Sequence, residues 1–499
     1  MHSKSNGLDR NSFHPDLTYP IYGEAESIYG YTDLHIRLCF SSGALLPLLR
    51  VTYKAKNEQT TAKVDDAEAL IKAFLPADQL FQDEASFERA VGEESSGAFT
   101  PLGEKTTAKV DDAEALIKAF LPADQLFQDE ASFERAVGEE SSGAFTPLGE
   151  KVHEYTRALQ SGTASKGKGK GRGSARGSTS ALQARGAASS SSDAGGNSER
   201  VFEIYRSDWS TPGWKEQHRR MQIFTLLFIE GASYIQEEEP AWQFYTLYER
   251  QASSLSATGY TWHFVGYTSL YNFWCYPDSS RVRLSQFIIL PPYQHAGHGQ
   301  ALYNKVLDDV IASPRVMELT VEDPSEAFDR VRDGADLRRL FDGDEAFAKR
   351  AAREGRLVPP LDQIWSEKMR STLKIAPRQW SRLVEMAQLL NLDQEDHEQM
   401  RHYRLQVKSR LYKFNKDVLQ QMSRGERVAK LHQTYEGVIE EYSSLTGVEV
   451  DDLLDDYALD EKDIREAELA GEAAAKEIAA AANGSANANG PARKMARLG

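Results

Sequence analysis

Two glycines separated by one histidine form the most chemically suggestive spacing in this chain. Gly297 and Gly299 lie in "LPPYQHAGHGQALYNKV", residues 290–306, between an apolar run and a helix-like pattern. Glycines let backbone N–H groups approach a ligand closely, and the start of a helix carries partial positive charge. The order of strand, turn and helix therefore predicts a cradle for a phosphate or pyrophosphate.

The spacing excludes two common phosphate-binding motifs. A dinucleotide fingerprint reads GxGxxG directly after a strand, and Leu302 stands at its third glycine position here. A P-loop needs Gly-Lys followed by Ser or Thr, which this turn lacks. What remains is the pattern QxxGxG, from Gln294 to Gly299, which an ordinary glycine turn would also produce.

The elements around this turn predict an α+β fold. Residues 27–54 predict strands with a turn at "SSGA", and residues 215–236 predict an amphipathic helix that ends near Gly231. Three strand-like runs then indicate an antiparallel meander. They lead into a β-turn-α-β unit with a strand at 286–290, a helix at 300–312 and a strand at 316–321. Asp323 before Pro324 predicts the N-cap of a further helix, and residues 363–445 predict a helical bundle.

Three segments interrupt this pattern. Residues 60–105 recur without change at 106–151. Two identical copies fit a recent duplication or an assembly artefact better than a solenoid, which stacks about three or more units; one copy suffices for the fold, and the other is a passenger. The Gly/Ser/Lys-rich stretch 161–199 and the acidic, Ala-rich tail 448–499 predict disorder.

Composition narrows the class of partner. The net charge is −16, which disfavours broad binding to nucleic acid and suits a basic partner such as a lysine-rich peptide. The two cysteines, Cys39 and Cys275, offer neither a disulfide framework nor a CxxC zinc motif, which favours a reducing compartment. We expect no signal peptide and no membrane span.

The QxxGxG turn after an antiparallel meander resembles the acetyl-CoA pyrophosphate loop of the Gcn5-related N-acetyltransferase superfamily. "SQFIILPPYQHAGHGQALY", "VGYTSLYNFWCYPDSSRVRLSQ", "LTVEDPSEAFDRVRD" and "FHPDLTYPIYGEAESIYGY" resemble segments of the type B histone acetyltransferase catalytic subunit. The resemblance covers about 13–58, one copy of the repeat and about 200–335. It implies a Gcn5-related core with a mixed, mostly antiparallel sheet and helices at 200–345. An N-terminal mixed, histone-binding domain at 1–160 and a C-terminal helical domain at 346–447 complete the predicted organisation.

The family transfers acetyl from acetyl-CoA to lysines near the N-terminus of newly made histone H4. The lysine must first lose its proton, because its reference pKa is about 10.4, and a buried carboxylate with a raised pKa can accept it. The resemblance assigns the general base to Glu322 and supporting acids to Asp323 and Glu230. Plainer interpretations stay open. Glu322 could be a solvated residue at the end of a strand, and Glu230 could be a surface charge at the end of a helix.

The resemblance also assigns the contacts to acetyl-CoA, and it implies no metal. Backbone groups of the strand edge 287–289 would bind the pantetheine arm, and a backbone N–H there could hold the oxyanion of the tetrahedral intermediate. His298 is interpreted as a loop residue rather than an acid. The implied contacts are Phe287, Ile288, Ile289, Gln294, His295, Ala296, Gly297, His298, Gly299 and Gln300.

The histone side is assigned to two segments. Glu24 and Glu26 align with an acidic patch, and Ala25 stands where another acid is usual. Tyr271, Asn272 and Phe273 align with a second segment that contacts the histone tail, although strand alternation would also bury part of it.

The implied partners are histone H4 with its histone partner and a WD40 histone chaperone, in cytoplasm and nucleus, with no sequence-specific contact to nucleic acid. Two alternatives stay open: an acetyltransferase for another protein lysine or amine, and a non-catalytic scaffold that binds acetyl-CoA or histone. Lys168 and Lys170, in a Gly-Lys-Gly context, resemble the histone tail. Two interpretations of this insert therefore stay open: a tethered pseudosubstrate, and a flexible linker.

Overall fold

The structure is a computed structural model. It describes residues 12–24, 26, 28–56, 67–72, 100–101, 145–158, 199–253, 256–341, 347–359, 361–450 and 453. Ala25, Lys168, Lys170, most of both repeat copies and nearly all of the insert and the tail lie outside these residues. The predictions of disorder, of a passenger copy and of a pseudosubstrate therefore stay predictions.

The chain divides into two compact units. The first comprises residues 1–268 and 288–293, and the second comprises residues 269–287 and 294–499. The predicted hairpin near the N-terminus is present in the first unit: β3 pairs antiparallel with β4, from His35 opposite Thr52 to Phe40 opposite Pro47. The elements of this region are β1 (Ser12–Phe13), α1 (Tyr19–Tyr22), β2 (Tyr31–Thr32), β3 (His35–Phe40), β4 (Pro47–Thr52), β5 (Ala55–Lys56), α2 (Ala67–Lys72) and β6 (Thr100–Pro101).

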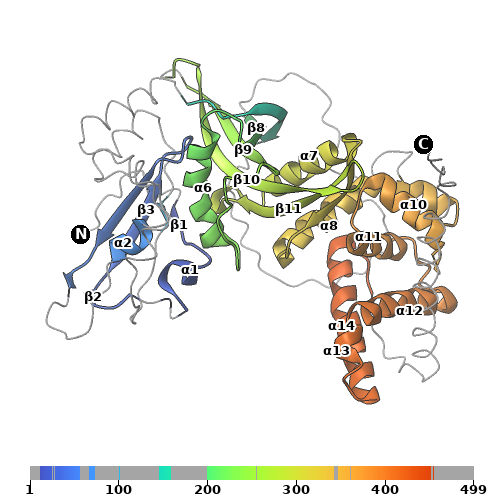
Figure 1. Ribbon diagram of the computed structural model, residues 1–499. Helices are drawn as coiled ribbons and strands as arrows, with labels where there is room; N and C mark the ends of the chain where they lie inside the picture. The colour runs from blue at the N-terminus through green and yellow to red at the C-terminus, as the bar shows by residue number, and fades with distance from the viewer. Residues whose placement is uncertain are drawn as a thin grey trace, which may run out of the picture. The chain divides into compact units, whose positions relative to one another are not determined.

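The larger sheet of the first unit has the strand order β7-β8-β9-β10, with antiparallel pairing of β7 to β8 and of β8 to β9 (Figure 1). Glu199, the last residue of the predicted insert, is the first residue of β8. The end of β10 belongs to the second unit. The strands are β7 (Glu150–Ala158), β8 (Glu199–Asp208), β9 (Trp242–Ala252) and β10 (Tyr260–Cys275).

Helix α6 (Trp214–Phe228) organises the core of the first unit. Phe224 on this helix packs against Phe264 of β10 and against Phe40 of β3, so the helix lies between the sheet and the N-terminal hairpin. The helix ends at Phe228, three residues before the predicted end near Gly231, because the backbone becomes extended at Ile229. The amide of Ile235 then donates to Oε1 of Gln222 at 2.7 Å, which holds the returning segment against the helix.

A fully buried histidine lies inside this core. The His218 ring lies among three aromatic rings, with centroids 4.7 Å from Phe244, 5.0 Å from Trp209 and 6.0 Å from Trp214. Within the described residues, neither ring nitrogen has a hydrogen-bond partner. Burial, and then the nearby charge of Arg219, lowers the pKa of His218 to about 3, so the folded protein keeps this ring neutral.

This lowered pKa predicts loss of stability in mild acid. Below about pH 6.5, the reference pKa, His218 becomes protonated in the unfolded chain but stays neutral in the folded protein, so protonation favours unfolding. Between pH 7 and pH 5 this proton uptake should lower the free energy of unfolding by about 2 kcal/mol. Replacing His218 by Phe should abolish that part of the pH dependence. Urea unfolding of both proteins at the two pH values measures this difference. Phe244→Leu, which keeps the histidine, should lower stability by similar amounts at both; an unchanged pH dependence in His218→Phe would contradict the assignment.

The second unit contains the predicted β-turn-α-β unit. Most of β11 (Ser279–Ile289) belongs to it, followed by α7 (His298–Ala312) and β12 (Val316–Val321). Its strand order is β10-β11-β12, and β12 pairs parallel to β11, so α7 is the crossover helix. Helix α8 (Glu326–Phe341) comes next and contacts α7 (Figure 1).

The predicted C-terminal helical bundle is present. Its core contains Trp380, Leu383, Tyr403, Val407 and Ile439, each at most 4% exposed. Side-chain caps start several helices; Ser423 and Glu426, for example, form a complete capping box. The helices are α9 (Phe347–Arg353), α10 (Gln363–Leu373), α11 (Pro377–Leu389), α12 (His397–Phe414), α13 (Lys416–Leu419) and α14 (Arg424–Thr446).

The predicted fold class is confirmed. The described sheets are mostly antiparallel, with parallel pairs at β11–β12 and at β1–β6, and helices accompany them. An N-terminal mixed region and a C-terminal helical bundle are both present. The proposed domain boundaries stay a prediction. No helix in the described part of the chain is long and apolar enough to span a membrane.

Candidate active site

The glycine turn forms the N-terminus of α7. Gly297 has φ 82° and is the left-handed N-cap residue, and His295 also has a positive φ of 58°. The helix begins at His298, two residues earlier than predicted, so Gly299 and Gln300 belong to its first turn. The first backbone amides of a helix have no acceptor in a preceding turn. This turn can therefore present N–H groups and a helix dipole to an anion, as the spacing predicted.

The loop residues differ in exposure. Gln294, His295 and Ala296 are exposed, whereas His298 is only 3% exposed. His298 is thus the first residue of α7 rather than a loop residue, and its burial does not suit an acid that meets substrate.

Two features shape the strand that leads into this turn. In the second unit, the amide of Gln286 donates to Oγ of Ser269 at 3.1 Å, which adds a side-chain contact between β11 and β10. In the first unit, Gly266 of β10 lies so close to β11 that a Cβ there would meet the carbonyl oxygen of Ile288 at 2.2 Å. The backbone at Ile288 and Ile289, assigned to the pantetheine arm, thus depends on a glycine opposite it.

Glu322 follows β12 and contacts two side chains of β11. Its Oε2 accepts a short hydrogen bond from Ser285, and its Oε1 lies 3.2 Å from Nη1 of Arg283. Its own amide donates to the carbonyl oxygen of Leu284 at 2.9 Å, which extends the parallel pairing by one residue. The side chain is 37% exposed, so the carboxylate is half-buried, whereas a buried one was expected.

Arg283 also links Glu322 to the segment assigned to the histone tail. Its guanidinium lies over the ring of Phe273, 4.8 Å from the centroid, and that ring packs against Tyr271 at 4.6 Å. The structure therefore brings together Tyr271, Phe273 and Glu322 within the second unit. Asn272, between the two aromatic residues, is half-exposed.

The prediction that Asp323 is an N-cap is wrong. Helix α8 begins at Glu326, and Oγ of Ser325 accepts from the amide of Phe328 at 3.3 Å, so Ser325 caps the helix. Asp323 itself has φ 34° and is exposed. A φ of 34° is not the extended backbone typical of an N-cap residue, and the helix begins only after Ser325.

The remaining predicted acids lie in the first unit. Tyr19 of α1 donates to Oε1 of Glu230 at 3.1 Å, and Thr18 donates to Oε2 of Glu26 through a short bond. Glu24, Glu26 and Glu230 are exposed. Glu230 is therefore connected to the N-terminal acidic segment, whereas Glu322 and Asp323 belong to the other unit.

Arg283, Ser285 and Gly266 were not singled out from the sequence. Alternation along "RVRLSQF" could have placed Arg283, Ser285 and Phe287 on one strand face, but only the register with β12 puts Glu322 beside them. Within the described residues, no group of three or more His, Cys, Asp or Glu side chains could hold a metal ion.

Two family models match the chain. The model described as histone acetyl transferase HAT1 N-terminus matches residues 1–111 and 104–230, so each match contains one copy of the repeat. The model described as fungal HAT1, C-terminal matches residues 333–393.

Relatives match over most of the chain. The histone acetyltransferase type B catalytic subunit of Mycosarcoma maydis is 49% identical over 97% of this chain and 94% of its own. The subunit of that name from Cryptococcus neoformans var. neoformans serotype D is 38% identical over 87% and 90%. A solved aminoglycoside acetyltransferase from an uncultured soil metagenomic sample aligns with TM-score 0.21 and 12% identity, over 29% of this chain and 91% of its own.

The sequence relationship defines the class of protein as an acetyltransferase. The chain belongs to the family of histone acetyltransferase type B catalytic subunits.

The close approach at Gly266 yields a prediction. Gly266→Ala should displace Ile288, because the clash is with a backbone oxygen that no rotamer change can move. We expect a loss of folding stability of about 1–3 kcal/mol and a loss of acetyl transfer, measured by urea unfolding and an acetylation assay. Gly437→Ala in α14 is the matched control: its Cβ would meet nothing within 4 Å, so stability should stay equal or rise. Equal stability and equal acetyl transfer in the two variants would contradict the role assigned to Gly266.

Proposed function

We propose that this acetyltransferase uses acetyl-CoA to acetylate N-terminal tail lysines of newly synthesised histone H4. The observation that carries the proposal is the β11–α7–β12 unit, in which an anion-binding helix start and a half-buried carboxylate flank a single pair of strands. The family relationship supports histone as the acceptor, and the H4 tail is the finer assignment.

The loop and the strand edge suit the two parts of acetyl-CoA. The pyrophosphate would lie against Gly297 and the first-turn amides of His298, Gly299 and Gln300, where charge-assisted hydrogen bonds are strongest. The pantetheine arm would follow the backbone at Phe287, Ile288 and Ile289. Gln294, His295 and Ala296 would complete the loop, and no metal takes part.

Glu322 would act as general base. Its carboxylate has acceptor sites beyond those that Ser285 and Arg283 occupy, so it can take the proton of the lysine ammonium directly or through water. The neutral amine then attacks the thioester carbon, the carbon–sulfur bond breaks, and the CoA thiolate receives a proton. Asp323 and Glu230 would act as supporting acids.

Charge and aromatic surface support a basic peptide as acceptor. Glu24, Glu26 and Glu230 are exposed, and the chain carries a net charge of −16. With Ala25, the first two form the segment that we assign to the histone tail. Tyr271, Asn272 and Phe273 supply the second segment, because aromatic faces bind lysine and arginine side chains.

The wider setting follows from the family resemblance. We expect histone H4 to be presented with its histone partner, and a WD40 histone chaperone to act as a stable second subunit. Function in both cytoplasm and nucleus fits an enzyme for newly synthesised histones.

Glu322→Gln should separate catalysis from binding. It keeps the shape of the side chain but cannot take up a proton, so kcat on an H4 tail peptide should fall by roughly 10²–10⁴-fold. Acetyl-CoA affinity, measured by calorimetry, should be unchanged. Glu326→Gln, an exposed substitution in the first turn of α8, should behave like wild type. Full activity in Glu322→Gln would exclude it as the base, and acetyl-CoA binding without transfer in wild type would favour a scaffold.

Phe273→Leu should affect the peptide rather than acetyl-CoA. It removes the ring that contacts Arg283 and Tyr271, so we expect the KM for the H4 peptide to rise roughly three- to tenfold, which corresponds to about 1 kcal/mol. Steady-state kinetics with each substrate varied in turn distinguish the two effects. Trp274→Leu, on the neighbouring and 71% exposed residue, is the comparison variant. A rise in the KM for acetyl-CoA alone would contradict the assignment of Phe273.

A further inference from the structure

Helix α7 carries a buried tyrosine that connects it to α8. The hydroxyl of Tyr303 donates to both carboxylate oxygens of Asp336, at 3.0 and 3.1 Å. Tyr303 is 3% and Asp336 is 1% exposed. Tyr303 stands five residues beyond His298, the first residue of the helix, so this bond holds the turn directly behind the anion-binding end.

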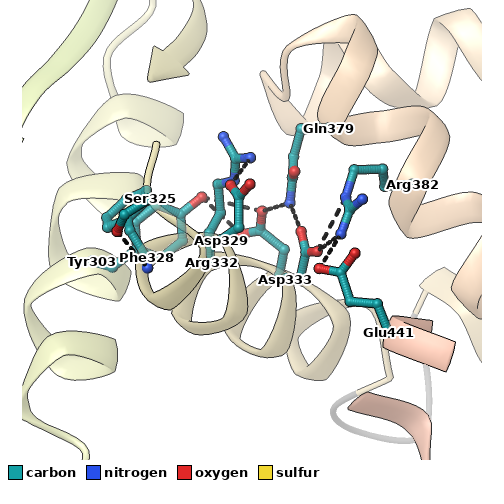
Figure 2. Close-up of polar contacts among 10 residues, drawn as sticks. Tyr303, Ser325, Phe328, Asp329, Arg332, Asp333, Gln379, Arg382 and Glu441 are labelled. Atoms are coloured by element: carbon teal, nitrogen blue, oxygen red, sulfur yellow. Dashed lines mark hydrogen bonds and ion pairs between the residues drawn. The ribbon is translucent and has the colours of Figure 1, made fainter. Parts of the chain in front are cut away.

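The same carboxylate is bound from the C-terminal bundle. Nε2 of Gln379, on α11, donates to Asp336 at 3.0 Å and to Asp333 at 2.7 Å. Arg382, one turn further along α11, pairs with Asp333 at 2.6 Å and with Glu441 of α14 at 2.8 Å. Figure 2 shows Gln379 and Arg382 reaching Asp333 and Glu441. A continuous polar chain therefore runs from α7 through α8 to α11 and α14.

These donors matter because the carboxyl of Asp336 is fully buried. Burial raises the pKa of Asp336 to about 7, and the hydrogen bonds from Gln379 and Tyr303 oppose that rise. Removing either donor would leave a buried acceptor short of partners, which is unfavourable.

A second contact from the same region holds the other end of α7. Nζ of Lys374, between α10 and α11, donates to the carbonyl oxygen of Val310 at 2.9 Å and, through a shorter bond, to that of Ser313. A cation at this position complements the negative end of the helix dipole. The carbonyl of Lys374 in turn accepts from the amide of Leu319 on β12 at 2.9 Å, so one residue ties the helix end to the strand.

We infer that Gln379 and Lys374 are positioning residues for acetyl-CoA, which fix α7 so that its first-turn amides face the pyrophosphate. The inference rests on the proposed function, because it takes acetyl-CoA as the ligand of that turn. A helix moves as a rigid rod, so contacts at its second turn and its C-terminus set the direction of its N-terminal amides. Displacements of about 1 Å at such sites can cost up to about 100-fold in rate.

The test compares two variants with a matched control. Gln379→Leu removes the donor to Asp336, and Lys374→Met removes the cation while keeping the stem. Glu385→Gln is the control on the same helix: Glu385 is 2% exposed and binds Arg410 at 2.7 Å and Tyr442 at 2.8 Å, on α12 and α14. It perturbs an equally buried network inside the bundle without removing the contact of Gln379 to α8 or that of Lys374 to α7.

Both variants should raise the KM for acetyl-CoA and its calorimetric Kd roughly five- to tenfold or more, with the KM for the H4 peptide unchanged. Glu385→Gln should lower thermal stability without this change, and Lys374→Arg should restore the affinity that Lys374→Met loses. If both variants match the control, or lose affinity only in proportion to stability, the inference is overturned. Should Gln379→Leu fail to fold, the acetyl-CoA affinity of Lys374→Met and its recovery in Lys374→Arg decide the outcome. Wild-type protein that binds no acetyl-CoA would refute the proposed function, and this inference with it.

Discussion

The parallel pairing of β11 with β12 is the constraint on which the candidate site depends. Parallel neighbours require a crossover, and α7 is that crossover, so the glycine turn lies where the chain leaves one strand and enters the helix. The register places Leu284 opposite Val321, which brings Glu322 beside Ser285. A slip of one residue would turn the carboxylate to the other face of the sheet.

The helices after β12 stabilise this unit from one side through polar rather than purely apolar contacts. Buried polar networks stabilise a fold only when nearly every member finds a partner, so they favour one arrangement over its close alternatives. Asp333 and Asp336 meet this condition because Tyr303, Gln379 and Arg382 all supply donors. Hydrogen bonds and ion pairs therefore connect the C-terminal bundle to α7, the helix that begins at the glycine turn.

The sequence predicted features that depend on neighbours along the chain. Local periodicity predicted the β-turn-α-β unit and the helical bundle, and spacing singled out the glycine turn at Gly297, which the structure places at the start of α7. It did not reveal Arg283 or Ser285, because their meeting with Glu322 depends on register between strands more than thirty residues apart. The need for glycine at position 266 was not predicted for a similar reason, because it depends on the close approach of the Ile288 carbonyl from the neighbouring strand. The predicted cap at Asp323 is wrong although it rested on local sequence, because Ser325, two residues further along, caps α8 instead.

The two identical copies of the repeat supply different described pieces. Helix α2 comes from the first copy, whereas residues 145–151, which lead into β7, come from the second. Thr100–Pro101, paired with β1, is the same dipeptide as Thr146 and Pro147 ahead of β7. Recombination that removes either copy yields one and the same shorter chain. In that chain a single Thr-Pro dipeptide would be both the partner of β1 and the residues just ahead of β7, so the segment that now separates these two roles would be absent.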